Sequence, residues 1–179
     1  MSGIFAIVGP SGVGKDTLME AVAARLPSVH LVRRVITRPE TAGGEDFEGV
    51  TEAEFARRLA RGDFAVHWQA HGLSYGIPVD AHDRLAAGET LLFNGSRAAL
   101  SAARAAFPEL KVIHVTARPG VLAARLAARG RETPAEIEKR LSRTIMEPNE
   151  GFKMFELDNS GNLTNAVDAL EKLLQPESS

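Results

Sequence analysis

The glycine-rich stretch GPSGVGKDT, near the start of the chain, restricts the fold more than any other feature of the sequence. It contains the pattern Gly-x-x-x-x-Gly-Lys, with Gly9, Gly14 and Lys15 at its fixed positions. An unbroken apolar run over residues 4–8 precedes it, and a helical pattern from Lys15 to Leu26 follows it. A buried strand, a glycine-rich loop and a helix in this order are typical of a phosphate-binding P-loop.

The residue types of this loop suit a nucleoside triphosphate. Glycines allow backbone N–H groups to turn inward around an anion, and the N-terminus of the following helix adds partial positive charge. The lysine of the pattern reaches the β- and γ-phosphates. We therefore expect ATP, the phosphoryl donor, to be bound by Gly9, Pro10, Ser11, Gly12, Val13, Gly14, Lys15, Asp16 and Thr17.

The position after the lysine departs from the pattern. A Ser or Thr there ligates Mg²⁺ through its hydroxyl, whereas in this chain Asp16 follows Lys15 and Thr17 comes one position later. Mg²⁺ usually binds through substrate phosphates and few protein carboxylates, so we still expect this ion. Asp16 and Thr17 are the candidate ligands, and whether Asp16 would bind the ion directly or through water stays open.

Strand-like segments alternate with helical patterns along the whole chain. Strands are expected at Val29–Ile36, Phe64–Ala70, Leu73–Tyr75, Thr90–Phe93, Lys111–Thr116 and Lys153–Leu157, with helices between most of them. Thr51 and Glu54 form a capping-box pattern at the start of one helix, which Gly62 ends. The alternation predicts a three-layer α/β fold, a parallel sheet with helices on both faces. We expect one domain over residues 1–179, with a frayed tail at 175–179.

Composition excludes several other classes of protein. The net charge of −2 argues against a broad basic face for nucleic acid, and the absence of cysteine excludes disulfides and thiolate chemistry. The apolar runs fall short of the ~20 residues that a membrane span needs. No signal-peptide pattern opens the chain, so we expect a cytoplasmic protein without a membrane partner. The oligomeric state stays open, a homodimer included.

Three further motifs, ITRPETAGGED, LSYGIP and RLAARGRETPAEIEKRL, follow the P-loop in this order. With them the chain resembles the guanylate-kinase group of P-loop kinases over nearly its whole length. The resemblance implies an acceptor-binding region at about 33–90 and an arginine-rich lid at about 126–145. The guanine-reading residues of that group are not matched, because the corresponding positions hold Gln69, Ile77 and Asn94. A buried isoleucine would leave a base donor without a partner, which costs about 1–3 kcal/mol.

A narrower family fits these departures. In GPSGVGKDT, VITR, GGED, HWQAHGLSYGIP, NGSR and RGRET the chain resembles the ribose 1,5-bisphosphate phosphokinases, enzymes of bacterial phosphonate use. The resemblance implies that ATP phosphorylates ribose 1,5-bisphosphate, a small sugar phosphate, to 5-phosphoribosyl 1-diphosphate with release of ADP. The alternative is a guanylate kinase-like enzyme acting on GMP. A kinase acting on a free hydroxyl, with Asp46 as its base, is a third interpretation. A phosphopeptide-binding scaffold is disfavoured by the complete P-loop.

The implied reaction needs positioning and charge neutralisation. A phosphate monoester with a second pKa near 6 is already ionised at neutral pH, so the acceptor needs no general base. We predict catalytic roles for Lys15, Arg131 and Arg140, and an ATP contact for Arg129. The predicted acceptor-binding residues are Arg38, Glu45, Tyr75, Asn94 and Arg97. Two plainer interpretations stay open: Arg125 as a solvated helix arginine and Tyr75 as a core aromatic.

Overall fold

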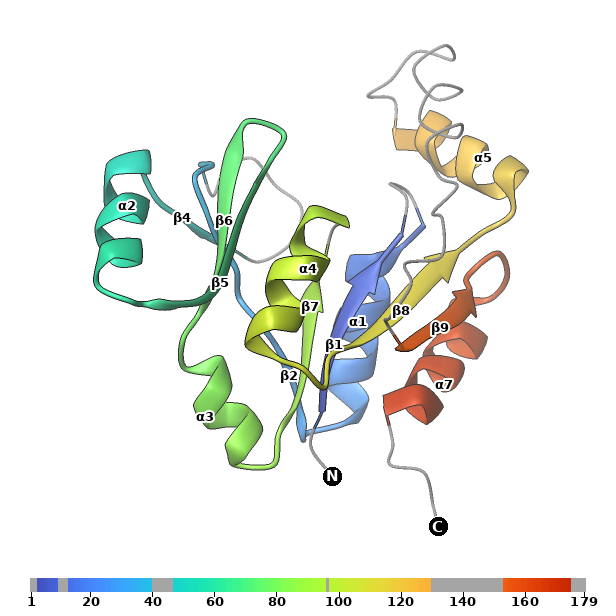
Figure 1. Ribbon diagram of the computed structural model, residues 1–179. Coiled ribbons are helices and arrows are strands. Elements are labelled where there is room, and N and C mark those ends of the chain that lie inside the picture. Colours follow the sequence, from blue (N-terminus) through green and yellow to red (C-terminus); the bar gives the residue numbers. More distant parts are fainter. Residues whose placement is uncertain (1–2, 10–12, 40–46, 96, 130–152, 175–179) are drawn as a thin grey trace.

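The computed structural model describes residues 3–9, 13–39, 47–95, 97–129 and 153–174. Five strands form one wholly parallel sheet, as expected from the alternation of strands and helices (Figure 1). In spatial order they are β2 (Val29–Leu31), β7 (Thr90–Asn94), β1 (Gly3–Val8), β8 (Lys111–Thr116) and β9 (Lys153–Asp158). Within the described ranges, no helix is long and apolar enough to cross a membrane.

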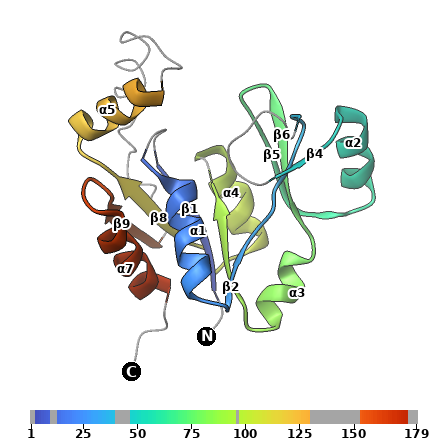
Figure 2. The same ribbon diagram turned by 180° about the vertical axis from the view of Figure 1, so that it is seen from behind.

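Helices cover both faces of this parallel sheet. The helix α4 (Arg97–Ala106) lies on one face, and α1 (Lys15–Arg25) and α7 (Leu163–Leu174) lie on the other, as two opposite views show (Figures 1 and 2). The helix α5 (Pro119–Arg129) follows β8. The predicted three-layer fold is therefore confirmed.

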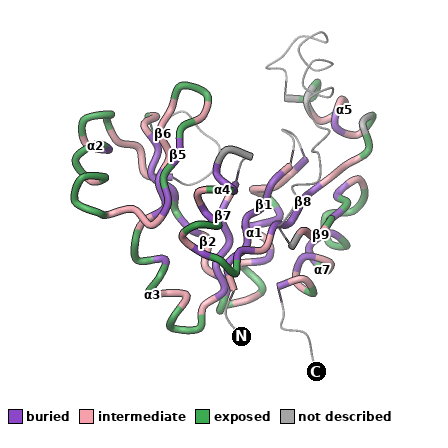
Figure 3. The backbone as a smooth tube through the Cα atoms, viewed as in Figure 1, coloured by how far each residue is buried: buried purple, intermediate pink, exposed green. Residues whose placement is uncertain are grey.

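The pleat of β1 divides the core between the two faces. Ile4, Ala6 and Val8 belong to the cluster under α4, whereas Phe5 and Ile7 belong to the cluster under α1 and α7. Successive side chains of a strand point to opposite faces, so an unbroken apolar run is what a strand covered on both sides requires. The buried residues accordingly concentrate on the central strands (Figure 3).

A second, four-stranded sheet stands beside the parallel one. Its order is β4 (Glu48–Gly49), β3 (Val35–Ile36), β6 (Leu73–Pro78) and β5 (Phe64–Ala70), and β5 and β6 form an antiparallel hairpin. The helix α2 (Glu52–Ala60) lies on its outer side, and α3 (Ala81–Ala86) leads back to β7 (Figure 1). This sheet contains most of the predicted acceptor-binding region.

The prediction of one strand over Val29–Ile36 was wrong, because this segment belongs to two sheets. Val32 N donates to Leu92 O (2.8 Å) and continues the pairing of β2 with β7. Two residues later, Glu48 N donates to Arg34 O (2.8 Å), and the chain is already beside β4. The predicted strand at Leu73–Tyr75 also continues further, to Pro78.

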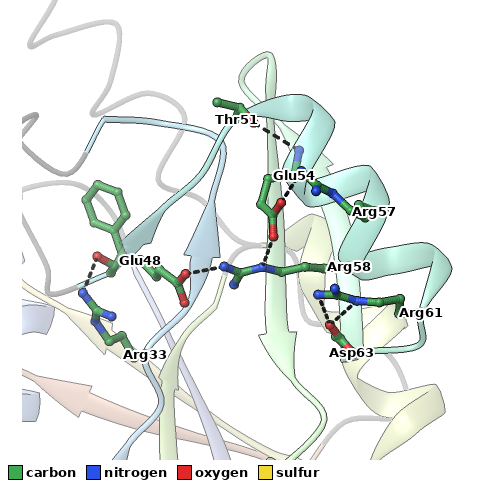
Figure 4. A network of polar contacts seen from close by, with 9 residues as sticks. Arg33, Glu48, Thr51, Glu54, Arg57, Arg58, Arg61 and Asp63 are labelled. Carbon is green, nitrogen blue, oxygen red and sulfur yellow. Dashed lines mark hydrogen bonds and ion pairs between the residues drawn. The ribbon is translucent and has the colours of Figure 1, made fainter.

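The helix α2 is joined to β4 through a network of arginines and carboxylates (Figure 4). Glu54 N donates to Thr51 Oγ1 (3.1 Å), which confirms the predicted N-cap. The Glu54 carboxylate accepts from Arg58 Nε (3.0 Å), and Arg58 Nη2 also donates to Glu48 (2.6 Å). Arg58 accordingly lowers the pKa of Glu48. One guanidinium thus links the helix to a strand of the second sheet.

Candidate active site

The described part of the P-loop and the predicted residue Asn94 lie at one edge of the parallel sheet, where its strands end. Gly9 follows β1, Asn94 ends β7, and Asn159 follows β9. In Figure 1 this is the edge opposite the N- and C-terminal ends of the chain, and α5 lies above it. Ligands of open α/β sheets bind outside the carboxyl ends of the strands, so this edge is where a nucleotide would be expected.

Neighbouring atoms leave no room for a side chain at Gly9 and Gly14, the two described glycines of the P-loop pattern. A Cβ on Gly9 would lie 2.5 Å from the carbonyl oxygen of Val115 in β8. Gly14 precedes α1 with a φ of 91°, and a Cβ there would lie 2.7 Å from Asn159 Nδ2. No other residue type fits either position without displacing its neighbours. The intervening Pro10, Ser11 and Gly12 lie outside the described residues.

Asn159 and Arg125, which the sequence did not indicate for this role, donate hydrogen bonds to the P-loop backbone at Val13. Asn159, which is buried, donates through Nδ2 to Val13 O (2.7 Å). Arg125 of α5 donates to the same carbonyl (3.3 Å) and to Asn159 O (2.7 Å). Arg125 therefore supports the P-loop through hydrogen bonds. The interpretation of Arg125 as a solvated helix arginine is wrong. Arg125 and Asn159, the pair nearest in sequence, are 34 residues apart. No local sequence pattern therefore predicts these contacts.

Lys15 lies against its own loop. Its ammonium group donates to Gly9 O (2.9 Å), and burial lowers its pKa, while the neighbouring Asp16 opposes that shift. A buried lysine without an anion is costly, because its charge has left water. The ammonium group lies beside Gly9 at the end of β1, where a bound phosphate would compensate its charge.

Asp16 and Asn94 are brought together from positions 78 residues apart in the sequence. Asn94 Nδ2 donates to Asp16 Oδ1 (3.4 Å), whereas Thr17 is exposed on α1. Carboxylate and hydroxyl oxygens are the hard ligands that suit Mg²⁺. In the described part of the chain, no group of three or more acidic, His or Cys side chains could hold a metal by itself. The donor set therefore fits an ion held mainly by ligand phosphates.

The predicted acceptor residues Arg38 and Tyr75 lie on the second sheet together with an arginine that was not predicted. The Arg34 guanidinium lies 5.2 Å from the centre of the Tyr75 ring, and that of Arg38 lies 4.4 Å from the centre of the Phe47 ring. The Tyr75 ring stacks on Trp68, with 5.4 Å between ring centres. Arg34 is only 7% exposed, and burial lowers its pKa to about 10. The doubled arginine before VITR was the only sequence signal for it.

The pairing of β5 with β6 shows on which face of the second sheet Gln69 and Ile77 lie. Val66 lies opposite Ile77, and these two buried residues share one face of the sheet. Gln69 lies opposite Ser74 and is exposed. It points to the other face, where it lines a cavity of about 610 Å³ beneath α2. The residue across from Ile77 is therefore an apolar valine.

The remaining predicted residues are not placed. Glu45, Arg131 and Arg140 lie outside the described residues. Arg97 and Arg129 are the first residue of α4 and the last of α5, and their side chains are outside the described part as well. Their roles in acceptor and ATP binding stay predictions.

Comparison with known proteins bears on this arrangement. A family model described as an AAA domain matches residues 6–146. Among solved structures, the guanylate kinase from Anaplasma phagocytophilum superposes with a TM-score of 0.69 at 18% identity, covering 97% of this chain and 84% of that one. A gluconokinase from Sinorhizobium meliloti 1021 gives a TM-score of 0.53 at 19% identity, covering 97% and 93%. Both likenesses concern the fold alone.

The curated relatives are much closer in sequence. The protein named ribose 1,5-bisphosphate phosphokinase PhnN from Ruegeria sp. (strain TM1040) is 51% identical over 176 residues, which covers 97% of this chain and 92% of the relative. A protein of the same name from Agrobacterium fabrum is 48% identical over 172 residues, covering 94% of each. With a P-loop built as described above and this identity over nearly the whole length, the chain belongs to the ribose 1,5-bisphosphate phosphokinase family of P-loop kinases.

Proposed function

We propose that this enzyme transfers the γ-phosphoryl group of ATP to ribose 1,5-bisphosphate, forming 5-phosphoribosyl 1-diphosphate and ADP. An oxygen of the acceptor's 1-phosphate attacks the γ-phosphorus, and the bond from that phosphorus to the β,γ-bridging oxygen breaks. The observation that carries the proposal is the 51% identity to a relative of that name, over 97% of this chain. The P-loop, with Lys15, and the predicted arginines of the acceptor site and the lid suit a reaction between two polyanions.

On the donor side, Lys15 would leave Gly9 O and contact the β- and γ-phosphates. The backbone N–H groups of the loop and the N-terminus of α1 would bind the same phosphates. Asp16, with Thr17, would hold Mg²⁺, directly or through water. When bound, this ion neutralises charge on the β- and γ-phosphates.

On the acceptor side, the chain needs to hold an anion that is already ionised at neutral pH. Arg38 and Tyr75 lie on the second sheet and would contact the sugar phosphate, with Asn94 at the boundary between the two substrates. Glu45 and Arg97 would complete this site. The lid arginines Arg129, Arg131 and Arg140 would cover the transferring group and stabilise its charge.

The apolar pair Val66 and Ile77 disfavours the alternative, GMP. Both are buried on the sheet face that also presents Tyr75. A guanine placed against them would lose hydrogen bonds to water and find no protein partner there, which costs about 1–3 kcal/mol for each donor or acceptor. A sugar phosphate has no base and does not need hydrogen-bond partners at these positions.

A coupled assay of ADP release tests the proposal, with ATP and Mg²⁺ and either ribose 1,5-bisphosphate or GMP as acceptor. The expected result is turnover of the bisphosphate at a kcat/KM at least 100-fold above that of GMP, which two lost hydrogen bonds would produce at about 1.4 kcal/mol each. Phosphorus NMR of the product should show a new diphosphate on C1. Lys15→Met serves as the control for contaminating ATPase. Turnover of GMP alone would refute the proposal in favour of the alternative.

A further inference from the structure

Two donors from separate parts of the chain converge on one carbonyl group of the P-loop. The oxygen of Val13 accepts from Asn159 Nδ2 (2.7 Å) and from Arg125 Nη1 (3.3 Å). A carbonyl oxygen has two lone pairs, so these two donors use both of them. One donor would already satisfy the carbonyl of this buried residue. The second donor adds a constraint on the direction in which the carbonyl points.

The two donors are themselves held in place. Asn159 N donates to Thr116 O (2.7 Å), which continues the pairing of β9 with β8. Asn159 O accepts from Arg125 Nη2 (2.7 Å), so one guanidinium of α5 contacts both Val13 and Asn159. The Val13 side chain is buried in the apolar cluster under α1 and α7. The side chain and the carbonyl group of Val13 are therefore both fixed by contacts with other elements.

The direction of this carbonyl determines where the next N–H group points. The described residues contain no cis peptide bond, and in a trans peptide the C=O and N–H groups point in opposite directions. The Gly14 N–H therefore points away from Arg125 and Asn159. Gly14 has left-handed backbone angles (φ 91°, ψ 28°) directly before the right-handed helix α1. Successive residues of opposite hand turn their N–H groups toward one concave side, which binds anions.

We propose that Arg125 and Asn159 are positioning residues for the phosphoryl donor. They set the direction of the peptide between Val13 and Gly14, so that the Gly14 N–H points at a phosphate of the bound nucleotide. Their side chains act through this peptide and need no contact with the nucleotide. Neither residue belongs to the predicted ATP-binding set. The inference rests on the proposed function only in taking ATP as the donor, and it holds whatever the acceptor is.

Calorimetry of ADP binding and steady-state kinetics of Arg125→Met and Asn159→Ala test this inference, at a temperature where each variant is folded. A misdirected N–H loses one hydrogen bond to a charged group. Both variants should therefore raise the Kd for ADP and the KM for ATP by about 10- to 100-fold, with the KM for the acceptor changed less than about threefold. Arg125→Lys keeps the charge without the planar fork and should recover part of the loss. Asn159→Ser, which keeps a shorter donor, replaces Asn159→Ala if that variant does not fold.

Two matched controls come from neighbouring positions. Asn162 lies in the same loop as Asn159, and its side chain caps α7 by accepting from Thr164 N (2.7 Å). Arg25 is an exposed arginine at the end of α1 that pairs with Asp168 of α7. Asn162→Ala and Arg25→Met should leave the Kd for ADP and the KM for ATP as in the wild type.

NMR of the backbone amides reports on the N–H group itself. ADP should move the Gly14 amide proton of the wild type downfield, because a hydrogen bond to a charged oxygen deshields it, and both variants should reduce this shift. A purely structural role would lower the Tm of the variants and leave their affinity for ADP unchanged.

The possible failures can be told apart. If both folded variants bind ADP as tightly as the wild type, or if only one of them loses affinity, the inference is overturned. ADP binding needs no acceptor. A wild type that binds ADP and does not turn over ribose 1,5-bisphosphate would therefore refute the proposed function, while the response of the two variants to ADP would still decide this inference.

Discussion

Removing the charge of Arg34 should stabilise the ligand-free protein. Burial lowers the pKa of Arg34 from its ordinary value to about 10, so the charged form is disfavoured in the folded state. This lowered pKa corresponds to a destabilisation of roughly 3 kcal/mol, present at every pH below about 10 and lost only as the pH rises above the folded-state pKa. Arg34→Met deletes this cost and keeps an apolar stem of similar length, but it forgoes about 0.5–2 kcal/mol from the contact with Tyr75.

The expected net effect is a gain of about 1–2 kcal/mol in the free energy of unfolding. For a chain of this size that is a rise in Tm of roughly 3–6 °C. Differential scanning calorimetry without ligands, at pH 7 and again at pH 9, measures it, and the gain should be equal at both values. Breaking a structural buried ion pair would instead cost about 3–5 kcal/mol. A lower Tm for Arg34→Met would therefore refute the expectation that the buried charge of Arg34 destabilises the ligand-free fold.

Three further changes have definite expected outcomes. Lys15→Met should lower kcat at least about 100-fold, because a charge that stabilises the transferring phosphoryl group is lost. The Tm of the ligand-free variant should not fall, since burial disfavours the charged ammonium in the wild type. Stopped assays measure kcat, and thermal melting measures the Tm. Gly9→Ala should raise the Kd for ATP at least about tenfold in calorimetry, because its methyl group would collide with the backbone of β8. Asn159→Ala should cost about 1–3 kcal/mol in urea unfolding, because the buried Val13 carbonyl loses a donor; an unchanged unfolding midpoint would contradict this role.

The strand, loop and helix that form the P-loop could be predicted from the sequence because they are local. The unbroken apolar run of β1 indicates burial on both faces, and Gly9, Gly14 and Lys15 follow at a fixed spacing. The structure adds a reason for each glycine, since a side chain at either position would contact β8 or Asn159. The N-cap at Thr51 was predictable for the same reason, because donor and acceptor are three residues apart.

The division of Val29–Ile36 between two sheets could not be predicted in this way. Both halves of the segment VHLVRRVI contain β-branched apolar residues, and these do not indicate which neighbour each strand will pair with. The hydrogen bonds that decide it involve Leu92 and Glu48, which are distant in the sequence. The same limit applies to Gln69 and Ile77, because the register of a hairpin sets which residues share a side, and Gln69 and Ile77 lie on opposite faces.

By itself, the sequence determined the class of fold, the position of the phosphate loop and the family to which the chain is similar. These conclusions depend on the spacing of residues that are close in the sequence and on the order of the motifs along the chain. Tertiary structure decided which polar and charged groups lie together: Arg125 with the backbone of Val13, Asn94 beside Asp16, and Arg34 buried over Tyr75. The physical reason is that burial and electrostatic interaction depend on distance in space, and the crossing of the chain between two sheets determines that distance.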